Sequence, residues 1–178
     1  MTEAFAWTLP IAVAELPADG RDYELNPGAA EREALARRAG VNAVPTLSAN
    51  LHVAPDGRGG ASVDGVLRAS VTQTCIVTLE EFDNQIEEPV LVRFAPPETI
   101  TADADGLLDI GGDDPPDPLV NGALDLAVVV GEFLALAVDP YPRKPGAVFE
   151  SPAEPSAGKD SPFAALEKLK DPSSGKKH

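Results

Sequence analysis

The single cysteine, Cys75, is the residue of this chain best suited to nucleophilic chemistry. A reactive thiol needs a nearby base, and His52 is the one candidate because the other histidine, His178, ends the chain. The alternation of residue types around Cys75 favours a different interpretation, a small buried residue on the apolar face of a strand. The same face would carry Val71, Val77 and Leu79.

Residues 101–112 resemble a calcium-binding loop in outline, with oxygen-bearing side chains at alternate positions and Gly106 in the sixth. The twelfth position is Gly112, where calcium loops need a bidentate glutamate. We therefore expect no metal site here, but a β-hairpin that turns at Asp105 and Gly106. The acidic residues that follow, as far as Asp117, are interpreted as a solvated loop.

Two pairs of adjacent carboxylates, Glu80 with Glu81 and Glu87 with Glu88, lie in strand-like sequence. Neighbouring residues of a strand point to opposite faces of a sheet. These pairs are therefore more typical of a soluble surface than of acid–base catalysis, and we assign them no catalytic role.

Basic residues are scarce in the middle of the chain. Arg93 is the sole basic residue between positions 80 and 139, and we expect it to form a structural ion pair. Arg143 and Lys144 lie between prolines and form the one compact basic spot outside the C-terminal tail. This spot could contact a phosphate or remain ordinary solvated charge, and both alternatives stay open.

No phosphate-binding glycine loop, nucleophile elbow or zinc-protease motif is present in the sequence. The glycines at 57–60 indicate a hairpin turn instead. One cysteine and two histidines also exclude an internal disulfide and a cysteine-rich zinc site. The sequence therefore predicts no enzyme, no cofactor and no metal, and favours a binding or assembly role.

The charge of the chain restricts its partners. Its 178 residues suffice for one globular domain, and the formal net charge is -15. A surface of that sign repels phosphate, so binding of the whole domain to DNA or RNA is disfavoured. The longest apolar stretch, 126–138, is interrupted by Gly131 and Glu132 and is too short for a membrane span. We expect neither an export signal nor a membrane anchor.

The elements that must position these residues follow from periodicity and turn residues. Glutamates at the start, arginines at the end and a following Gly40 predict a surface helix over 29–39. An apolar stripe predicts a packed helix over 126–138, with Asp125 as its N-cap. Strands are predicted over residues 5–8, 11–16, 19–26, 46–53, 61–79 and 86–94. The expected fold class is α+β, with a mainly antiparallel sheet that is open or barrel-like.

Residues 1–149 are interpreted as one globular domain, and residues 150–178 as a disordered, mildly basic tail. Within the tail, residues 162–170 could form about two turns of helix, too short to be stable alone but able to dock on a partner. The candidate contacts in this helix are Phe163, Leu166 and Leu169 on the apolar side, with Lys168 and Lys170 beside them.

Three segments, taken together, resemble the YceD family of bacterial proteins, in the form associated with alphaproteobacteria. They are residues 73–82, the helix opening at Asp125 and Leu126 with Glu132, and residues 136–143. Residues 162–166 are also similar to the tail of relatives, so the resemblance covers about residues 5–170. Many relatives have Cys, any residue, Arg, Cys, Leu, Glu in the first segment. Here Val77 and Thr78 replace the arginine and the second cysteine, so a thiol pair or metal site is not expected.

The resemblance implies a cytoplasmic, non-catalytic role in ribosome biogenesis, in support of large-subunit (23S) ribosomal RNA. Because the chain is acidic, we expect it to act through a ribosome-assembly or RNA-processing protein, contacted by Arg143, Lys144 and the tail. Direct contact with RNA and the oligomeric state stay open. Two other hypotheses also stay open: an acidic adaptor or chaperone whose residues 80–117 shield a basic client, and an enzyme that uses Cys75 and His52.

Overall fold

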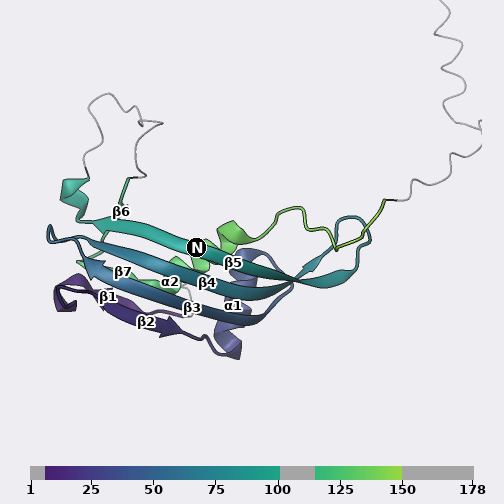
Figure 1. Cartoon of the computed structure of the whole chain (residues 1–178), viewed down its shortest axis with the longest axis horizontal. Coiled ribbons are helices and arrows are strands. Elements are labelled where there is room, and N and C mark those ends of the chain that lie inside the picture. The colour runs from purple at the N-terminus through teal and green to yellow at the C-terminus, as the bar shows by residue number, and fades with distance from the viewer. Residues whose placement is uncertain (1–6, 101–114, 150–178) are drawn as a thin grey trace, which may run out of the picture.

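The structure, a computed structural model, describes residues 7–100 and 115–149. Its main feature is a curved five-stranded sheet with the strand order β2-β3-β4-β5-β6 (Figure 1). Neighbouring strands are antiparallel, except that β5 and β6 are parallel. The strands are β2 (Arg21–Leu25), β3 (Ala43–Pro55), β4 (Ala61–Thr74), β5 (Glu81–Ala95) and β6 (Asp117–Pro118).

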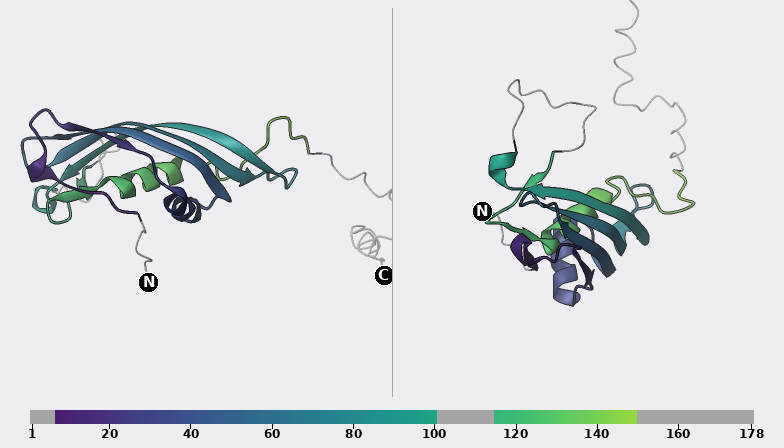
Figure 2. Two further views of the ribbon diagram at one scale, coloured as in Figure 1. Left: turned by 90° about the horizontal axis from the view of Figure 1, so that it is seen from below. Right: turned by 60° about the vertical axis from the view of Figure 1, so that its left-hand side comes forward.

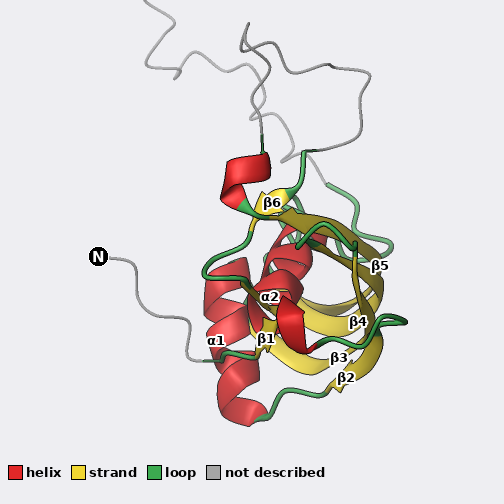
Figure 3. Cartoon of the chain, turned by 90° about the vertical axis from the view of Figure 1, so that its left-hand side faces the viewer, coloured by secondary structure: helices red, strands yellow, loops and turns green. Residues whose placement is uncertain are grey.

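Two helices and a small second sheet complete the described part of the chain. The second sheet pairs β1 (Pro10–Ala12) with β7 (Ala123–Asp125) in antiparallel register. The helices are α1 (Ala29–Ala39) and α2 (Leu126–Ala137), with short 3₁₀ turns η1 (Val13–Glu15) and η2 (Pro97–Thr99). The sheet curves around the helices, and α2 lies along its concave side (Figures 2 and 3).

The α+β expectation is confirmed, and the sheet is open, because β2 and β6 form its two edges. The barrel-like alternative is therefore wrong. Buried side chains alternate with more exposed ones along β3, as a sheet with one face in the core requires. The core between the sheet and the helices includes Leu51, Leu67, Val71, Val90 and Leu134.

Helix α1 begins and ends where the sequence predicts. The Glu31 carboxylate accepts a hydrogen bond from the Gly28 N–H at its start, which satisfies one of the free amides there. Gly40 follows the helix with a φ of 69°, in the left-handed conformation that glycine adopts without strain. Leu35 is fully buried against the sheet.

Helix α2 confirms the prediction of a capped and packed helix. The Asp125 carboxylate accepts hydrogen bonds from the N–H groups of Ala127 and Val128, at 2.9 and 3.4 Å. The same oxygen accepts the Leu9 N–H at 2.9 Å, which links the helix start to the segment before β1. The predicted apolar stripe is buried or partly buried: Leu126, Val129, Val130, Phe133, Leu134 and Ala137.

Two strand predictions are wrong at their ends. The strand predicted over 61–79 stops at Thr74, and a turn follows, so Val77 and Leu79 do not share a strand face with Cys75. The run 11–16 divides into the end of β1 and the turn η1. The edge strand predicted within 19–26 is confirmed as β2.

Several predictions lie outside the described residues. They are the first part of the strand over 5–8, the hairpin and calcium-like outline at 101–112, and the tail from 150 onward.

Candidate functional site

Strands β4 and β5 are joined by a turn at residues 75–80, which we name the Cys75 turn. The Cys75 N–H donates to the Glu80 carbonyl and the Leu79 N–H donates to the Cys75 carbonyl, both at 2.9 Å. Leu79 has a φ of 60°, in the left-handed region that costs a non-glycine residue roughly 1–2 kcal/mol. Its side chain is 77% exposed, so burial does not offset the strain.

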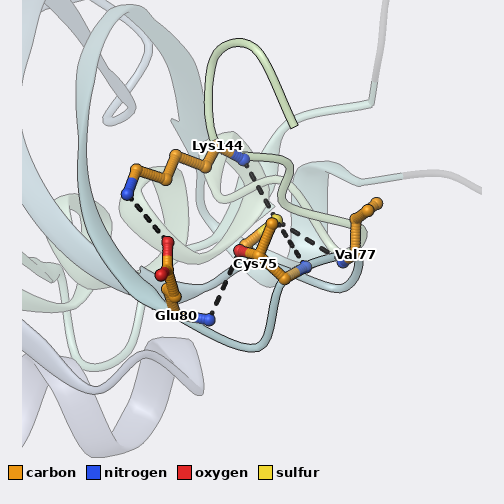
Figure 4. A network of polar contacts seen from close by, with 5 residues as sticks. Cys75, Val77, Glu80 and Lys144 are labelled. Atoms are coloured by element: carbon orange, nitrogen blue, oxygen red, sulfur yellow. Dashed lines mark hydrogen bonds and ion pairs between the residues drawn. The ribbon is translucent and has the colours of Figure 1, made fainter. Parts of the chain in front are cut away.

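The Cys75 thiol is the acceptor at the centre of this turn. Its Sγ lies 3.4 Å from the amide nitrogen of Val77, 3.5 Å from that of Thr78 and 3.3 Å from that of Lys144 (Figure 4). The Thr78 hydroxyl and these amides stabilise negative charge on sulfur and lower the pKa of the thiol to about 7, although burial acts in the opposite direction. The buried thiol thus holds the turn together.

The segment after α2, residues 139–149, runs beside the Cys75 turn, and we name it the strap (Figure 1). The side-chain amide of Gln73, at the end of β4, donates from Nε2 to the Asp139 carbonyl at 2.8 Å. The Ile76 N–H donates to the Pro142 carbonyl at 2.9 Å. The strap is therefore attached to the end of β4 and to the Cys75 turn, because its backbone carbonyls accept hydrogen bonds from both.

An ion pair makes a further attachment. The Lys144 ammonium lies 2.9 Å from the Glu80 carboxylate, which raises the pKa of Lys144 (Figure 4). The predicted basic spot is thus divided: Lys144 pairs within the fold, whereas Arg143 is exposed and forms no ion pair with the part of the chain that the structure describes.

His52 is not placed near the thiol. It lies on β3, opposite Asp64 of β4, and Cys75 comes eleven residues after Asp64. At about 3.3 Å per strand residue, roughly 35 Å of strand separates the two groups. The Nδ1 of His52 lies 2.6 Å from the Asp22 carboxylate, and this hydrogen bond raises the pKa of His52. The structure therefore does not assemble the thiol–imidazole pair that the enzyme hypothesis needs.

The adjacent glutamates also contact separate partners. Glu81 accepts from the Asn42 side-chain amide at 2.5 Å, and Glu87 lies 3.0 Å from Arg68 across the strand pair. Between residues 7 and 100 and between 115 and 149, no three histidine, cysteine or carboxylate side chains gather as metal ligands. In the same ranges, no helix has the length and apolar character of a membrane span.

The end of the molecule that carries the Cys75 turn exposes large apolar side chains. They are Ile76 and Leu79 in the turn, Leu136 in the last turn of α2, and Tyr141 in the strap. Isolated exposed apolar residues are ordinary, but several on adjoining segments mark a surface suited to binding. The predicted tail contacts Phe163, Leu166, Leu169, Lys168 and Lys170 lie outside the described residues.

The sequence interpretation did not single out Gln73. A glutamine that ends a strand has no distinguishing pattern, and its role appears only when the strap is in place. The one signal was that residues 73–82 and 136–143 both carried the family resemblance. The structure joins these two segments in one site.

Comparison with known proteins agrees with that resemblance. A family model described as "Large ribosomal RNA subunit accumulation protein YceD" matches residues 63–170, more than half of the chain. The chain belongs to the YceD family. The match begins within β4, so residues 5–62 of the wider resemblance lie outside it. No curated protein and no solved structure matches the chain.

Membership of the YceD family supports a ribosome-related role. The matched residues include the whole Cys75 turn and the strap. Within the matched residues, Thr78 stabilises the Cys75 thiolate.

Proposed function

We propose that this protein is a non-catalytic factor of the cytoplasm that supports accumulation of large-subunit (23S) ribosomal RNA during ribosome biogenesis. The observation that carries the proposal is the match to the YceD family model over residues 63–170. The separation of Cys75 from His52, by roughly 35 Å along the strands, supports a role without catalysis.

The charge of the chain supports action through a protein partner, such as a ribosome-assembly or RNA-processing protein. A net charge of -15 repels the phosphates of RNA, whereas ribosomal RNA is accompanied by basic proteins that such a surface attracts. The exposed apolar residues Leu79 and Tyr141 add contact area, and Arg143 is exposed on the strap two residues after Tyr141. Together with Lys144 and the tail, Arg143 forms the proposed contact region.

The proposal is tested by the ratio of large-subunit to small-subunit ribosomal RNA after depletion of the protein in its host. We expect a selective loss of the large-subunit RNA that re-expression restores. A ratio that stays unchanged during depletion contradicts the proposed role.

The contribution of the tail is tested separately by deletion of residues 159–178. Partner capture should fall because Phe163, Leu166 and Leu169 are removed, while the circular dichroism spectrum of the remaining domain stays the same. Equal capture by the truncated and full-length proteins contradicts the tail contact and leaves the strap as the proposed contact.

A second candidate is an acidic adaptor or chaperone that binds basic clients generally. The face of the sheet turned away from the helices favours it, because acidic side chains outnumber basic ones there. The exposed acids on β4 and β5 are Asp64, Glu81, Asp83 and Glu87, against Arg68 and Arg93. Salt-sensitive binding to basic proteins unrelated to the ribosome would support this candidate over the first.

A further inference from the structure

A pocket of about 410 Å³ lies where α1, α2, β4 and the strap meet. The C-terminal ends of both helices border it, so the negative ends of two helix dipoles lie at the same place. Gln73 and Ile76 form one wall, and Asp139 forms part of another.

Gln73, which lines the pocket, carries an unused acceptor that surrounding atoms cover. Its side chain is only 5% exposed, and its Oε1 has no hydrogen-bond partner in the described structure. The orientation of the amide is fixed, because Nε2 faces the Asp139 carbonyl, which can only accept. A buried amide oxygen without a donor is unfavourable, so this atom is suited to a donor from outside the chain.

Several donors of the wall are already used within the fold. The N–H groups of Gly40 and Val41 both donate to the Ala36 carbonyl. The Asn42 N–H donates to Thr72, and its side-chain amide donates to Thr74 and Glu81. The two prolines of the strap, at 140 and 142, have no N–H. The pocket therefore presents acceptors and no spare backbone donors from these residues.

Negative charge adds to this preference for a donor. Asp139 is exposed, and its Oδ1 accepts the Tyr141 N–H at 2.8 Å. The carboxylate of Glu81 lies at the same end, where Asn42 holds it. Val41, Ile76 and Val138 provide apolar walls between these polar groups. A side chain with an apolar stem and a cationic head fits this combination.

We propose that this pocket binds an arginine side chain of a basic segment in the partner protein. The inference rests on the proposed function in one respect, that the partner is a protein. The aliphatic stem lies against Val41 and Val138, and the guanidinium donates to Gln73 Oε1 and to the Asp139 carboxylate. A planar guanidinium with five donors can reach two acceptors at once. The compact ammonium of lysine matches such a pair of acceptors less well.

The test is a nuclear magnetic resonance titration of the ¹⁵N-labelled full chain with N-acetyl-arginine amide. N-acetyl-citrulline amide, which has the same shape without the charge, is the comparison probe. We expect saturable shifts of Gly40, Asn42 and the Gln73 side-chain amide, with a Kd of about 1–10 mM. The citrulline probe should bind at least ~5-fold more weakly. Because Gln73 Oε1 is shielded from solvent, the donor must displace the edge of the strap, so the Tyr141 amide should shift too.

Two variants locate the binding. Asp139→Asn removes the charge but keeps an oxygen for the Tyr141 N–H and the carbonyl for Gln73, so the fold is retained and the Kd should rise ~3–10-fold. Gln73→Leu removes the buried acceptor and should raise the Kd by a similar factor. Gln85→Leu is its matched control, since Gln85 donates to Ser70 elsewhere in the fold, outside the pocket.

Two results overturn the proposal: pocket amides that do not shift with the arginine probe, or an Asp139→Asn protein that binds the probe as tightly as the unchanged chain. Failure of the proposed function is separate. A ribosomal RNA ratio unaffected by depletion would contradict the biogenesis role while arginine binding in the pocket stands.

Discussion

The two turns at opposite ends of β4 are closed in the same way by different residues. In each turn, one side-chain atom accepts hydrogen bonds from backbone N–H groups. The turn at residues 56–60 is held by Asp56, whose Oδ1 accepts the N–H groups of Arg58 and Gly60 at 2.7 and 2.8 Å. The Cys75 turn is held in the same manner by a thiol. In the first turn, the left-handed positions are glycines, with φ of 73° at Gly57 and 87° at Gly59.

In the Cys75 turn, the left-handed position is an exposed leucine, and one of the amides on the thiol comes from the strap, 69 residues away. The first turn is therefore closed by its own residues, whereas the second is complete only when α2 and the strap are in place. A strained, exposed apolar residue that stability does not require is typical of a binding surface. The difference separates a turn closed by its own residues from a turn closed by a distant segment.

The largest effect is expected at the first turn. A Cβ at Gly60 would lie 2.3 Å from the Phe94 carbonyl oxygen, so Gly60→Ala must displace backbone. We expect the free energy of unfolding to fall by about 2–3 kcal/mol. Urea denaturation checks this value. A loss below ~0.5 kcal/mol would show that the turn at residues 56–60 accommodates the added methyl group easily.

Removal of the thiol should weaken the second turn and the strap together. In Cys75→Ala, three amides lose their acceptor, and we expect Tm to fall by several degrees. Amide hydrogen exchange should accelerate at Lys144 as well as Thr78. Asp56→Ala is the matched variant, in which faster exchange should stay within residues 56–60. If faster amide exchange stayed within the mutated turn in both variants, this would contradict closure of the Cys75 turn by the strap.

Relief of the strain at Leu79 should stabilise the fold. Glycine adopts a φ of 60° without the cost that leucine incurs, and the exposed side chain contributes little burial. We expect Leu79→Gly to raise the free energy of unfolding by about 0.5–1 kcal/mol while it weakens partner capture. A variant that is less stable and captures the partner normally would show that Leu79 is structural.

The smallest effect expected is a pH dependence from the thiol. The pKa of Cys75 is about 7 in the folded protein, below the ordinary value of 9.0, so the folded state favours the thiolate. The resulting stabilisation is complete above pH ~9 and is lost as the pH falls through 7. Absorbance of the thiolate at about 240 nm should titrate near pH 7, and Cys75→Ser should lack this part of the stability profile. A thiol pKa of 9 in the folded chain would contradict stabilisation of the thiolate by the amides of Val77, Thr78 and Lys144.

Local sequence signals were sufficient to predict both helices. The Asp125 cap and the glycine at position 40 act within one turn of their helices, so neighbouring residues alone carry the information. The end of β4 was predicted wrongly because Val77 and Leu79 continue the alternation of apolar residues. The strand stops where the thiol of Cys75 accepts amides from the turn, and residue periodicity does not express that contact.

The sequence by itself determined the α+β class, the two helices, the hairpin turn at residues 57–60 and the net charge. These properties depend on composition, periodicity and caps, which act over short distances along the chain. The tertiary structure alone decided the attachment of the strap to the Cys75 turn and the pocket that Gln73 lines. These contacts join residues more than sixty positions apart, and they exist only when the packing of α2 on the sheet brings the strap beside β4.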